Sequence, residues 1–298
     1  MNIVYSFIGK LPAYSVETVH QLRLFYTGPV YFILDDFASP YIPELEKLDV
    51  KIVSYERVMD VDFLNLAAMN IYKFVNVPVL REREQLFMRS FERFFLLKNL
   101  MAYNRLSDVL FLELDNLLYD NPTKWLGGFQ QKDMAFMFDN YDRCSSGICY
   151  VKNTDILTMF ITDCTEFIRI STEFMSEMTV LYRFYMKNME RIQLLPILWE
   201  GIYPKQVYEN SQAYEGIFDA AALGIYIGGM DIALTGGKVI PKAKMRFSYL
   251  DYSPFETVWR EEEGLRIPYI QNPEGKWIRI NNLHLHSKVF TPHLSKGM

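Results

Sequence analysis

The sequence predicts an α/β fold in which a mostly parallel, mixed central sheet is flanked by helices. Two observations predict this class. Short apolar segments typical of buried strands alternate, along the first half of the chain, with segments whose apolar residues recur at helical spacing. The 298 residues, 50% of them hydrophobic, are also enough to bury one large core. The chain has no internal repeat and no low-complexity linker, and we therefore expect a single domain over residues 1–298.

The first half contains the clearest elements. Strands are expected at residues 3–8, 30–34 and 50–55, with a helix at residues 16–26. The strongest helical pattern covers residues 82–101, where apolar side chains recur every three or four positions. These are Phe87, Phe91, Phe94, Leu97 and Met101. The next run, 109–114, is apolar except for Glu113, which is typical of a buried central strand.

The second half alternates less regularly. Strands are expected at residues 134–138, 148–151, 192–198, 265–270, 276–280 and 283–289. Helices are expected at 154–169, 172–187 and 218–226. The polar residues just before the first two of these helices are suited to cap a helix N-terminus.

Composition excludes several classes of function. The net charge is -5 and no basic run is present, so the sequence argues against a general nucleic-acid binder. The three cysteines, Cys144, Cys149 and Cys164, lack the paired spacing of a disulfide framework or zinc site. The N-terminus has the pattern of a strand and not of a signal peptide, and no apolar stretch is long enough to span a bilayer. We therefore expect free thiols and a cytoplasmic protein.

Glu113 and Asp115 are the first candidate site residues. They lie two positions apart at the end of the predicted strand 109–114 and are therefore expected to point to the same side. The carboxyl ends of strands border the ligand crevice in open α/β sheets. With Asn116 next to them, the two acids would suit a hard divalent cation. The alternative is a strand end or helix cap whose acids simply meet solvent.

The segment FLELDNLLY around these acids resembles the DxD region of metal-dependent GT-A glycosyltransferases, with Glu in the place of the first acid. The resemblance implies a GT-A fold, a single Rossmann-like domain that transfers a sugar from a nucleotide-diphosphate donor to a hydroxyl of a glycan or other acceptor. UDP-sugar is the default donor. Asp115 is then a metal ligand, and Glu113 contacts the ribose, or the metal through water.

Two further segments follow in the order of that superfamily. The segment SSGICYVKN resembles its glycine-containing turn, in which Gly147 lets the backbone approach the sugar or acceptor closely. The segment EGIFD stands in the place of the acidic motif beside the acceptor. If the reaction inverts, Asp219 is the candidate general base and Glu215 the reserve. The alternative for Asp219 is a helix cap, and the choice between inversion and retention stays open.

The C-terminal segment NNLHLHSK holds two of the four histidines. An extended chain would place His284, His286 and Lys288 on one face, opposite two leucines. The segment resembles the C-terminal element whose histidine completes the metal shell in GT-A enzymes. The resemblance implies that His286 is a ligand, that His284 is a weaker candidate and that Lys288 neutralises the diphosphate. A mixed carboxylate and imidazole shell favours Mn²⁺ over Mg²⁺.

Nucleotide contacts are expected at the ends of the first two strands, where GT-A enzymes hold the base and ribose. Basic residues that share one face of helix 82–101 are expected to reach the diphosphate. The residues concerned are Phe7, Ile8, Gly9, Asp35, Asp36, Arg89 and Arg93. Solvated turn acids and surface ion pairs are the alternatives for the charged ones.

The resemblance divides the expected domain into a nucleotide-binding half, residues 1–120, and an acceptor-binding half, residues 121–298, that includes the metal-ligand strand. Two other functions stay open. A metal-dependent sugar nucleotidyltransferase or phosphohydrolase would use the same acids, but usually carries a glycine-rich basic loop after the first strand. Residues 7–12 hold one glycine and one lysine. The other alternative is a non-catalytic carbohydrate-binding protein with a degenerate transferase fold.

Overall fold

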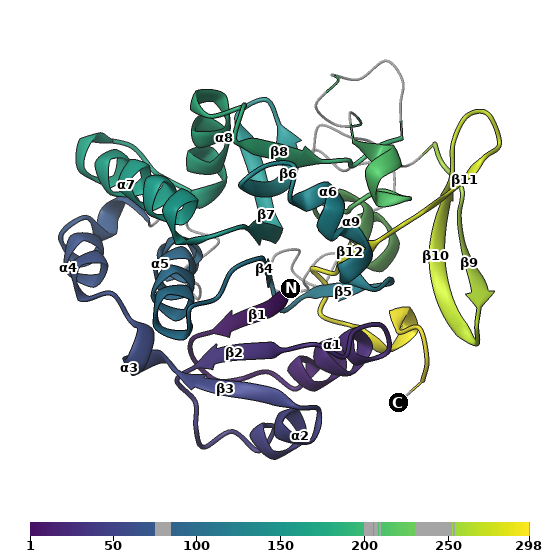
Figure 1. Ribbon diagram of the computed structural model, residues 1–298, viewed down its shortest axis with the longest axis horizontal. Helices are drawn as coiled ribbons and strands as arrows, with labels where there is room; N and C mark the ends of the chain where they lie inside the picture. The colour runs from purple at the N-terminus through teal and green to yellow at the C-terminus, as the bar shows by residue number, and fades with distance from the viewer. Residues whose placement is uncertain are drawn as a thin grey trace.

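A seven-stranded mixed sheet in the order β3-β2-β1-β4-β7-β6-β8 forms the centre of the protein (Figure 1). The computed structural model describes residues 1–74, 85–199, 205, 208, 210–229, 252 and 254–297. The strands are β1 Asn2–Phe7, β2 Val30–Leu34, β3 Val50–Ser54, β4 Val109–Leu112, β6 Met134–Asn140, β7 Arg143–Val151 and β8 Ile192–Leu195. Only β7 runs against its neighbours β4 and β6, and the other pairs are parallel. The predicted α/β class with a mostly parallel mixed sheet is confirmed.

Helices flank this sheet. They are α1 Tyr14–Arg23, α2 Ile42–Lys47, α3 Tyr55–Val58, α4 Val61–Met69, α5 Leu86–Asn104, α6 Leu126–Phe129, α7 Thr154–Ile170, α8 Glu177–Lys187 and α9 Ala222–Gly228. The helices α4, α5, α7 and α8 pack against one another (Figure 1). No helix in the described ranges is long and apolar enough to cross a membrane.

The apolar stripe predicted on the longest helix is confirmed in α5. Phe91, Phe94, Leu97 and Met101 are fully buried, because the helix packs against α7 and Phe94 faces Phe111 of β4. Phe87 is partly buried and contacts Phe174, with ring centroids 4.7 Å apart. The first predicted positions, residues 82–84, lie outside the described residues.

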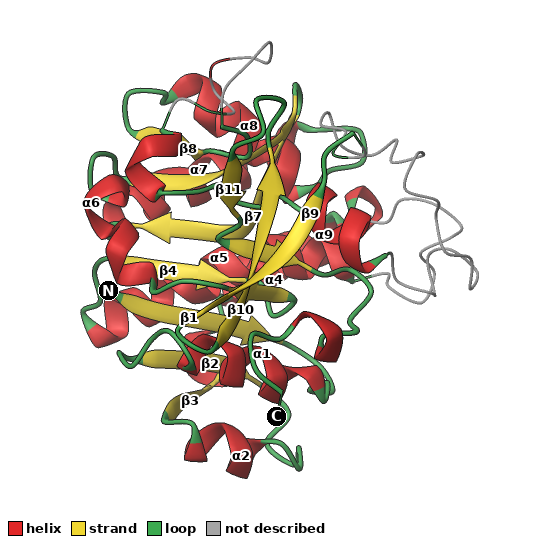
Figure 2. Ribbon diagram, turned by 90° about the vertical axis from the view of Figure 1, so that its right-hand side faces the viewer, coloured by secondary structure: helices red, strands yellow, loops and turns green. Residues whose placement is uncertain are grey.

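Two smaller sheets complete the fold. Strand β5, Asn116–Leu118, pairs antiparallel with β12, Asn282–His284. Strands β9 Thr257–Glu262, β10 Leu265–Gln271 and β11 Trp277–Arg279 form an antiparallel sheet that crosses in front of the central strands in Figure 2. The prediction of a strand at 283–289 is therefore wrong beyond His284, where the chain turns. Strand β9 was not predicted from the sequence.

The strand register places the carboxyl ends of β1, β2 and β4 at one edge of the sheet. Phe7 lies opposite Leu34 of β2, and Tyr5 lies opposite Leu112 of β4. The chain proceeds from β1 to β2 and β3 on one side and then returns to place β4 on the other side of β1. Ligand crevices in open α/β sheets form at such a reversal, next to the carboxyl ends. The fold thus brings the loop after β1 and the residues after β4 to one place.

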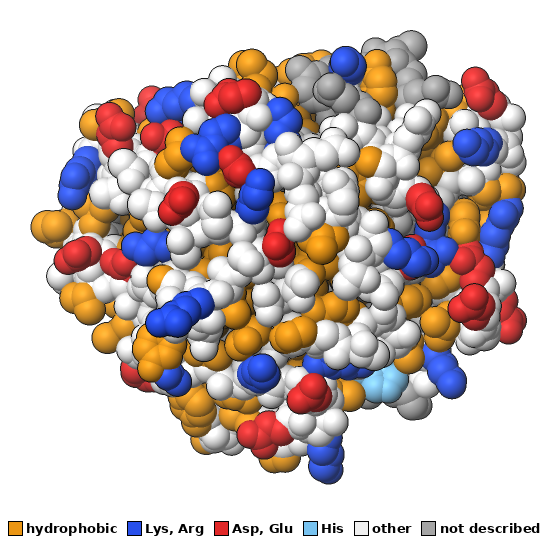
Figure 3. Space-filling view, in the orientation of Figure 1, with side chains coloured by type: hydrophobic (Ala, Val, Ile, Leu, Met, Phe, Trp, Pro, Cys, Tyr) orange, Lys and Arg blue, Asp and Glu red, His pale blue; other side chains and the backbone are white. Residues whose placement is uncertain are grey.

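Basic and acidic side chains are interspersed on the face of the protein drawn in Figure 3. Cys144, Cys149 and Cys164 are all buried and free.

Candidate metal and nucleotide site

Six side chains of alternating charge form a continuous row beside the carboxyl end of β4. In order they are Glu177, Arg93, Glu113, His284, Asp115 and Lys288. Arg93 Nη2 lies 3.1 Å from Glu177 Oε1, and Arg93 Nη1 contacts Glu113. His284 Nε2 lies 3.1 Å from Glu113 Oε2 and 3.3 Å from Asp115 Oδ1. Each charge in the row therefore has an opposite charge beside it, which offsets the cost of partial burial.

The two predicted acids occupy a turn and not the end of a strand. Strand β4 ends at Leu112, and the Asn116 N–H bonds the Glu113 carbonyl at 3.1 Å before β5 begins. Glu113 N–H also bonds the Gly147 carbonyl of β7 at 2.9 Å. The expected convergence of the two carboxylates is therefore produced by this turn, since both reach the same imidazole of His284.

The histidine segment reaches the acids through the pairing of β12 with β5. His284 lies opposite Asn116 in this ladder, and the Leu285 N–H bonds the Asp115 carbonyl at 2.9 Å. The strand ends at His284, so the predicted extended face does not continue to Lys288. Instead a turn, closed by the Lys288 N–H on the Leu285 carbonyl at 3.1 Å, brings the Lys288 ammonium to Asp115.

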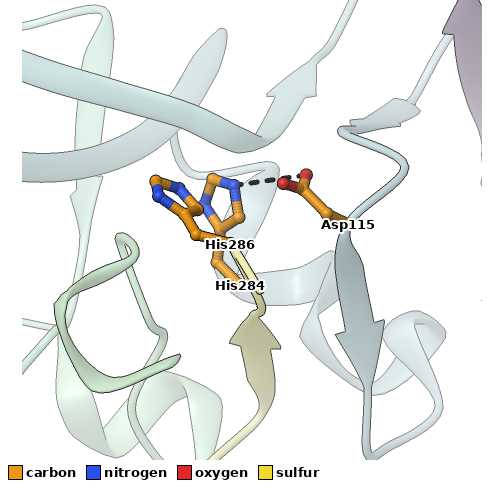
Figure 4. Close-up of side chains that lie close together, drawn as sticks. All are labelled: Asp115, His284 and His286. Carbon is orange, nitrogen blue, oxygen red and sulfur yellow. Dashed lines mark ion pairs between the residues drawn. The ribbon is translucent and has the colours of Figure 1, made fainter. Parts of the chain in front are cut away.

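Asp115, His284 and His286 form a cluster suited to a metal ion. One ligand atom from each lies within 4.8 Å of the others (Figure 4). The rings of the two histidines are 4.6 Å apart, centroid to centroid. One carboxylate oxygen and two imidazole nitrogens fit a divalent transition metal. Glu113 lies beside this cluster and contacts it through His284.

The surroundings of His284 and His286 give the two histidines different protonation states. Burial lowers the pKa of His284, but the Asp115 and Glu113 carboxylates more than reverse this effect and raise it to about 10. Burial and the neighbouring His284 lower the pKa of His286 to about 4. At neutral pH His286 is therefore a neutral imidazole with an available lone pair, while His284 carries a proton that a metal would displace.

Both acids are ionised at neutral pH. Burial acts to raise the pKa of Glu113, but Arg93 and His284 lower it to about 2. Burial likewise opposes ionisation of Asp115, whereas His284 and Lys288 hold its pKa well below the usual range. Two carboxylates thus stay charged in a partly buried place, as metal binding requires.

Gly147 lies directly under the histidine. A Cβ atom at this position would meet His284 Nδ1 and Asn116 Nδ2, each at 2.9 Å. The close approach of Gly147 to a sugar or acceptor stays a prediction, and the groups that lie against the glycine in this structure are side chains of the site itself. Its lack of a side chain leaves room for the His284 ring.

Three of the predicted nucleotide residues, Gly9, Asp35 and Asp36, line an open hollow of about 390 Å³ at the carboxyl ends of β1 and β2. It is lined by Gly9, Lys10, Asp35, Asp36, Ala38, Ser39 and Pro40. Asp35 Oδ1 accepts the Gly9 N–H at 2.8 Å, and Asp36 Oδ2 accepts the Leu11 N–H at 3.1 Å. The two acids therefore connect the loop after β1 to the loop after β2. Phe7 and Ile8 are not among the lining residues and pack partly against the core.

The two arginines of α5 have different surroundings. Arg93 is buried, pairs with Glu113 and Glu177, and donates to Ser146 Oγ at 2.6 Å. Arg89 pairs with Glu92 at 2.5 Å, one turn away from the site. Sequence reasoning placed both at the diphosphate, whereas in the structure only Arg93 reaches the carboxylate row, through Glu113.

Asp219 and Glu215, the two candidate general bases, differ in burial and in hydrogen bonding. Asp219 is fully buried, and its carboxylate accepts backbone N–H groups at the start of α9, which is the helix-cap alternative. With its oxygens engaged in this way, the general-base assignment has no support in the geometry. Glu215 is exposed, with a left-handed backbone (φ 51°), at the end of the 3-10 turn Ser211–Tyr214.

Sequence reasoning missed Glu177 and Ser146 as members of the site. Glu177 stands in the first turn of α8 after the capping Ser176, where an acid is ordinarily explained by the helix dipole. Its partner Arg93 is 84 positions away, so no local pattern could have found it. Ser146 lies next to Gly147, which was selected, and position alone was the available signal.

Comparisons with known proteins give likeness in fold only. The sequence matches no protein-family model and no curated protein sequence. Solved structures similar to this chain are glycosyltransferases of the GT-A type, the superfamily whose motifs the sequence resembles. The apo form of mouse xyloside xylosyltransferase 1 aligns over 65% of this chain and 84% of its own, with 9% identity and a TM-score of 0.45.

Two further glycosyltransferase structures align over similar parts of the chain. The galactosyltransferase LgtC, solved with donor and acceptor sugar analogues, covers 66% of this chain and 73% of its own at 9% identity, with a TM-score of 0.41. GlyE of Streptococcus pneumoniae TIGR4 covers 65% of this chain and 45% of its own at 11% identity, with a TM-score of 0.40.

Proposed function

We propose that this chain is a metal-dependent glycosyltransferase, which transfers a sugar from a nucleotide-diphosphate donor, by default a UDP-sugar, to a hydroxyl of a glycan or other acceptor. The observation that carries the proposal is the convergence of Asp115, His284 and His286 beside Lys288. This cluster follows β4, the neighbour of β1 in the sheet, and an open hollow lies between the loops after β1 and β2. Metal ligands and a cation at the sheet reversal are parts that diphosphate chemistry needs.

Asp115 and His286 would hold the ion, with His284 as the third ligand after it loses its proton. Imidazole ligands favour Mn²⁺ over Mg²⁺, which prefers oxygen. When bound, such an ion supplies Lewis-acid stabilisation of the negative charge on a leaving diphosphate. Lys288, already beside Asp115, adds a second positive charge for the phosphates.

Glu113 has the role of a hydrogen-bond acceptor for the donor ribose. Arg93 fixes its carboxylate from one side and His284 from the other, so the side chain has little freedom. A group fixed in this way loses little entropy when it binds a hydroxyl. Asp35 and Asp36 line the hollow and would accept hydrogen bonds from the base or ribose.

The division into a nucleotide half and an acceptor half follows from the same proposal. Residues 1–120 contain both the lining of the hollow and the two acids after β4. The histidines and Lys288 come from residues 121–298 and return to these acids. The acceptor would approach from the side of β6 and β8, whose carboxyl ends lie at the same edge of the sheet.

Nucleotide release from a panel of nucleotide sugars, with and without MnCl₂, tests the proposal. The variants are Asp115→Asn and, as a control, Asp142→Asn, which alters an acid whose side chain is 80% exposed. We expect Mn(II)-dependent release of the nucleoside diphosphate, lost in D115N and retained in D142N. Release of a nucleoside monophosphate would instead indicate a phosphohydrolase, and unchanged activity of D115N would refute the proposed site.

A further inference from the structure

Asp219 carries a buried carboxylate that the proposed chemistry does not use. Its side chain is fully buried, and four backbone N–H groups point to it. Oδ1 accepts from Ala221 at 2.8 Å and from Leu223 at 2.9 Å. Oδ2 accepts from Gly224 at 2.7 Å and from His284 at 2.8 Å. No lysine or arginine within the described ranges pairs with it, so backbone N–H groups compensate its charge.

The fourth of these bonds joins two separate parts of the chain. Three donors belong to the start of α9, whereas the His284 N–H belongs to the end of β12, 65 positions later. One carboxylate oxygen thus holds helix α9 and the backbone of a candidate metal ligand together. A cap that served α9 alone would need no contact with β12.

Asn282 extends the same connection to the acids. Its Oδ1 accepts the Asp219 N–H at 2.9 Å, and its Nδ2 donates to the Asp219 carbonyl at 3.1 Å. Nδ2 also donates to Asn116 Oδ1 at 2.7 Å, in the strand that directly follows Asp115. All three side chains are buried, where the loss of one hydrogen bond is costly.

The packing of α9 leaves no space for His284 to shift. A Cβ atom on Gly224 would lie 2.1 Å from the His284 carbonyl oxygen and 2.7 Å from Asp219 Oδ2. The His284 peptide is therefore held on its N–H side by Asp219 and on its carbonyl side by the backbone of α9. If the Asp219 carboxylate moves, His284 must move with it, and the His284 imidazole lies 3.3 Å from Asp115.

We propose that Asp219 is a positioning residue of the metal site: it fixes the backbone of His284 against α9 and thereby sets the distance between the imidazole and Asp115. It acts through His284 and touches neither the ion nor the donor. The inference rests on the proposed function, because it assigns Asp219 to the metal site of that function.

Mn(II) affinity measured by calorimetry on Asp219→Asn tests this role. The matched control is Asp60→Asn, since Asp60 caps α4 through the Phe63 N–H at 2.9 Å and belongs to no part of the site. We expect both variants to unfold at lower temperature. We expect D219N alone to bind Mn(II) about 10-fold or more weakly, as loss of an orienting partner does.

Two results would overturn the inference in different ways. Wild-type affinity for Mn(II) in folded D219N contradicts the positioning role and leaves the proposed function intact. Absence of Mn(II) binding in the wild-type protein contradicts the proposed function and this role with it.

Amide hydrogen exchange on the wild-type chain keeps the test valid if D219N does not fold. Mn(II) is expected to slow exchange of the His284 amide and also of the Ala221, Leu223 and Gly224 amides, which bond the same carboxylate without touching the ion. The Phe63 amide, capped by Asp60, serves as the control and should not change. Slowing at His284 without any slowing in α9 would refute the connection.

Discussion

The Lys288 ammonium contacts the Asp115 carboxylate and so joins a C-terminal turn to the turn after β4, 173 positions earlier in the chain. The ion pair leaves the lysine 29% exposed and the aspartate 12% exposed. Lys288 is therefore the more exposed partner of the pair, and under the proposed function it would release Asp115 to a metal and turn to a bound phosphate.

Lys288→Met should separate these two effects. Removing the ammonium frees Asp115, so we expect Mn(II) alone to bind no more weakly than in the wild type. UDP in the presence of Mn(II) should bind about 10-fold more weakly, because one charge-assisted contact is lost. Calorimetry with each ligand measures both. Lys276→Met, at an exposed lysine before β11, is the control, and equal loss in both variants would contradict the assignment.

Arg93→Gln and Arg89→Gln compare two arginines of one helix. Each pairs with a buried glutamate, so each loss should lower stability; for Arg93, whose loss removes the arginine partner of Glu177 and leaves Glu113 with His284 alone, the cost is about 3–5 kcal/mol. Only R93Q should weaken Mn(II)-dependent UDP binding per mole of folded protein, since only Arg93 holds Glu113. Thermal unfolding and UDP titration check this pair, and R89Q weakening UDP binding to the same degree would argue against it.

Gly147→Ala should disturb the metal site by steric contact. The added methyl group would meet His284 Nδ1 at 2.9 Å, and the ring can yield only by moving relative to Asp115. We expect a loss of about 1–3 kcal/mol in stability from overpacking and a measurable loss of Mn(II) affinity. Gly127→Ala, with nothing within 4 Å of the new methyl, should change neither by more than about 1 kcal/mol. Normal Mn(II) affinity in G147A would count against the placement of His284.

The pH dependence of stability should carry the signature of Asp139. Burial raises its pKa from 3.8 to about 6, despite the Arg143 partner at 2.8 Å. A folded-state pKa above the unfolded value means that folding takes up a proton between these limits. Stability should therefore fall as pH rises from about 4 to 6 and stay lower above that.

Asp139→Asn should remove this dependence while keeping an acceptor for Arg143. Relative to the wild type, the variant should gain on the order of 2 kcal/mol between pH 4 and pH 7. Urea unfolding at both pH values measures the change. A stability difference that is the same at both values would contradict the raised pKa.

The sequence predicts the central sheet well because its signals are local. Strands β1, β2, β3 and β6 fall close to the predicted ranges, since each is a short apolar run bounded by turn residues. The break between β4 and β5 could not be predicted in this way, because the apolar Leu114 continues the pattern through the turn. Helix α9 begins at Ala222 and not at residue 218, because the Asp219 side chain accepts an N–H group of its first turn and so precedes the helix.

Only part of the site can be predicted from the sequence, because its contacts join residues that are far apart in the chain. The acids and the histidines can be selected by residue type, spacing and resemblance. The row of alternating charge also needs Arg93 and Glu177, which come from α5 and α8 and meet only in the folded chain. The role of Asp219 likewise depends on one hydrogen bond between α9 and β12.

Calorimetric titration of UDP into the wild-type protein and Asp115→Ala, with and without Mn(II), tests the central claim most directly. The account predicts UDP binding by the wild type that depends on Mn(II), and its loss in folded D115A, whose thermal stability is lowered because His284 and Lys288 lose their carboxylate partner. Binding of UDP that is equally tight in folded D115A with Mn(II) present would contradict the metal-diphosphate site.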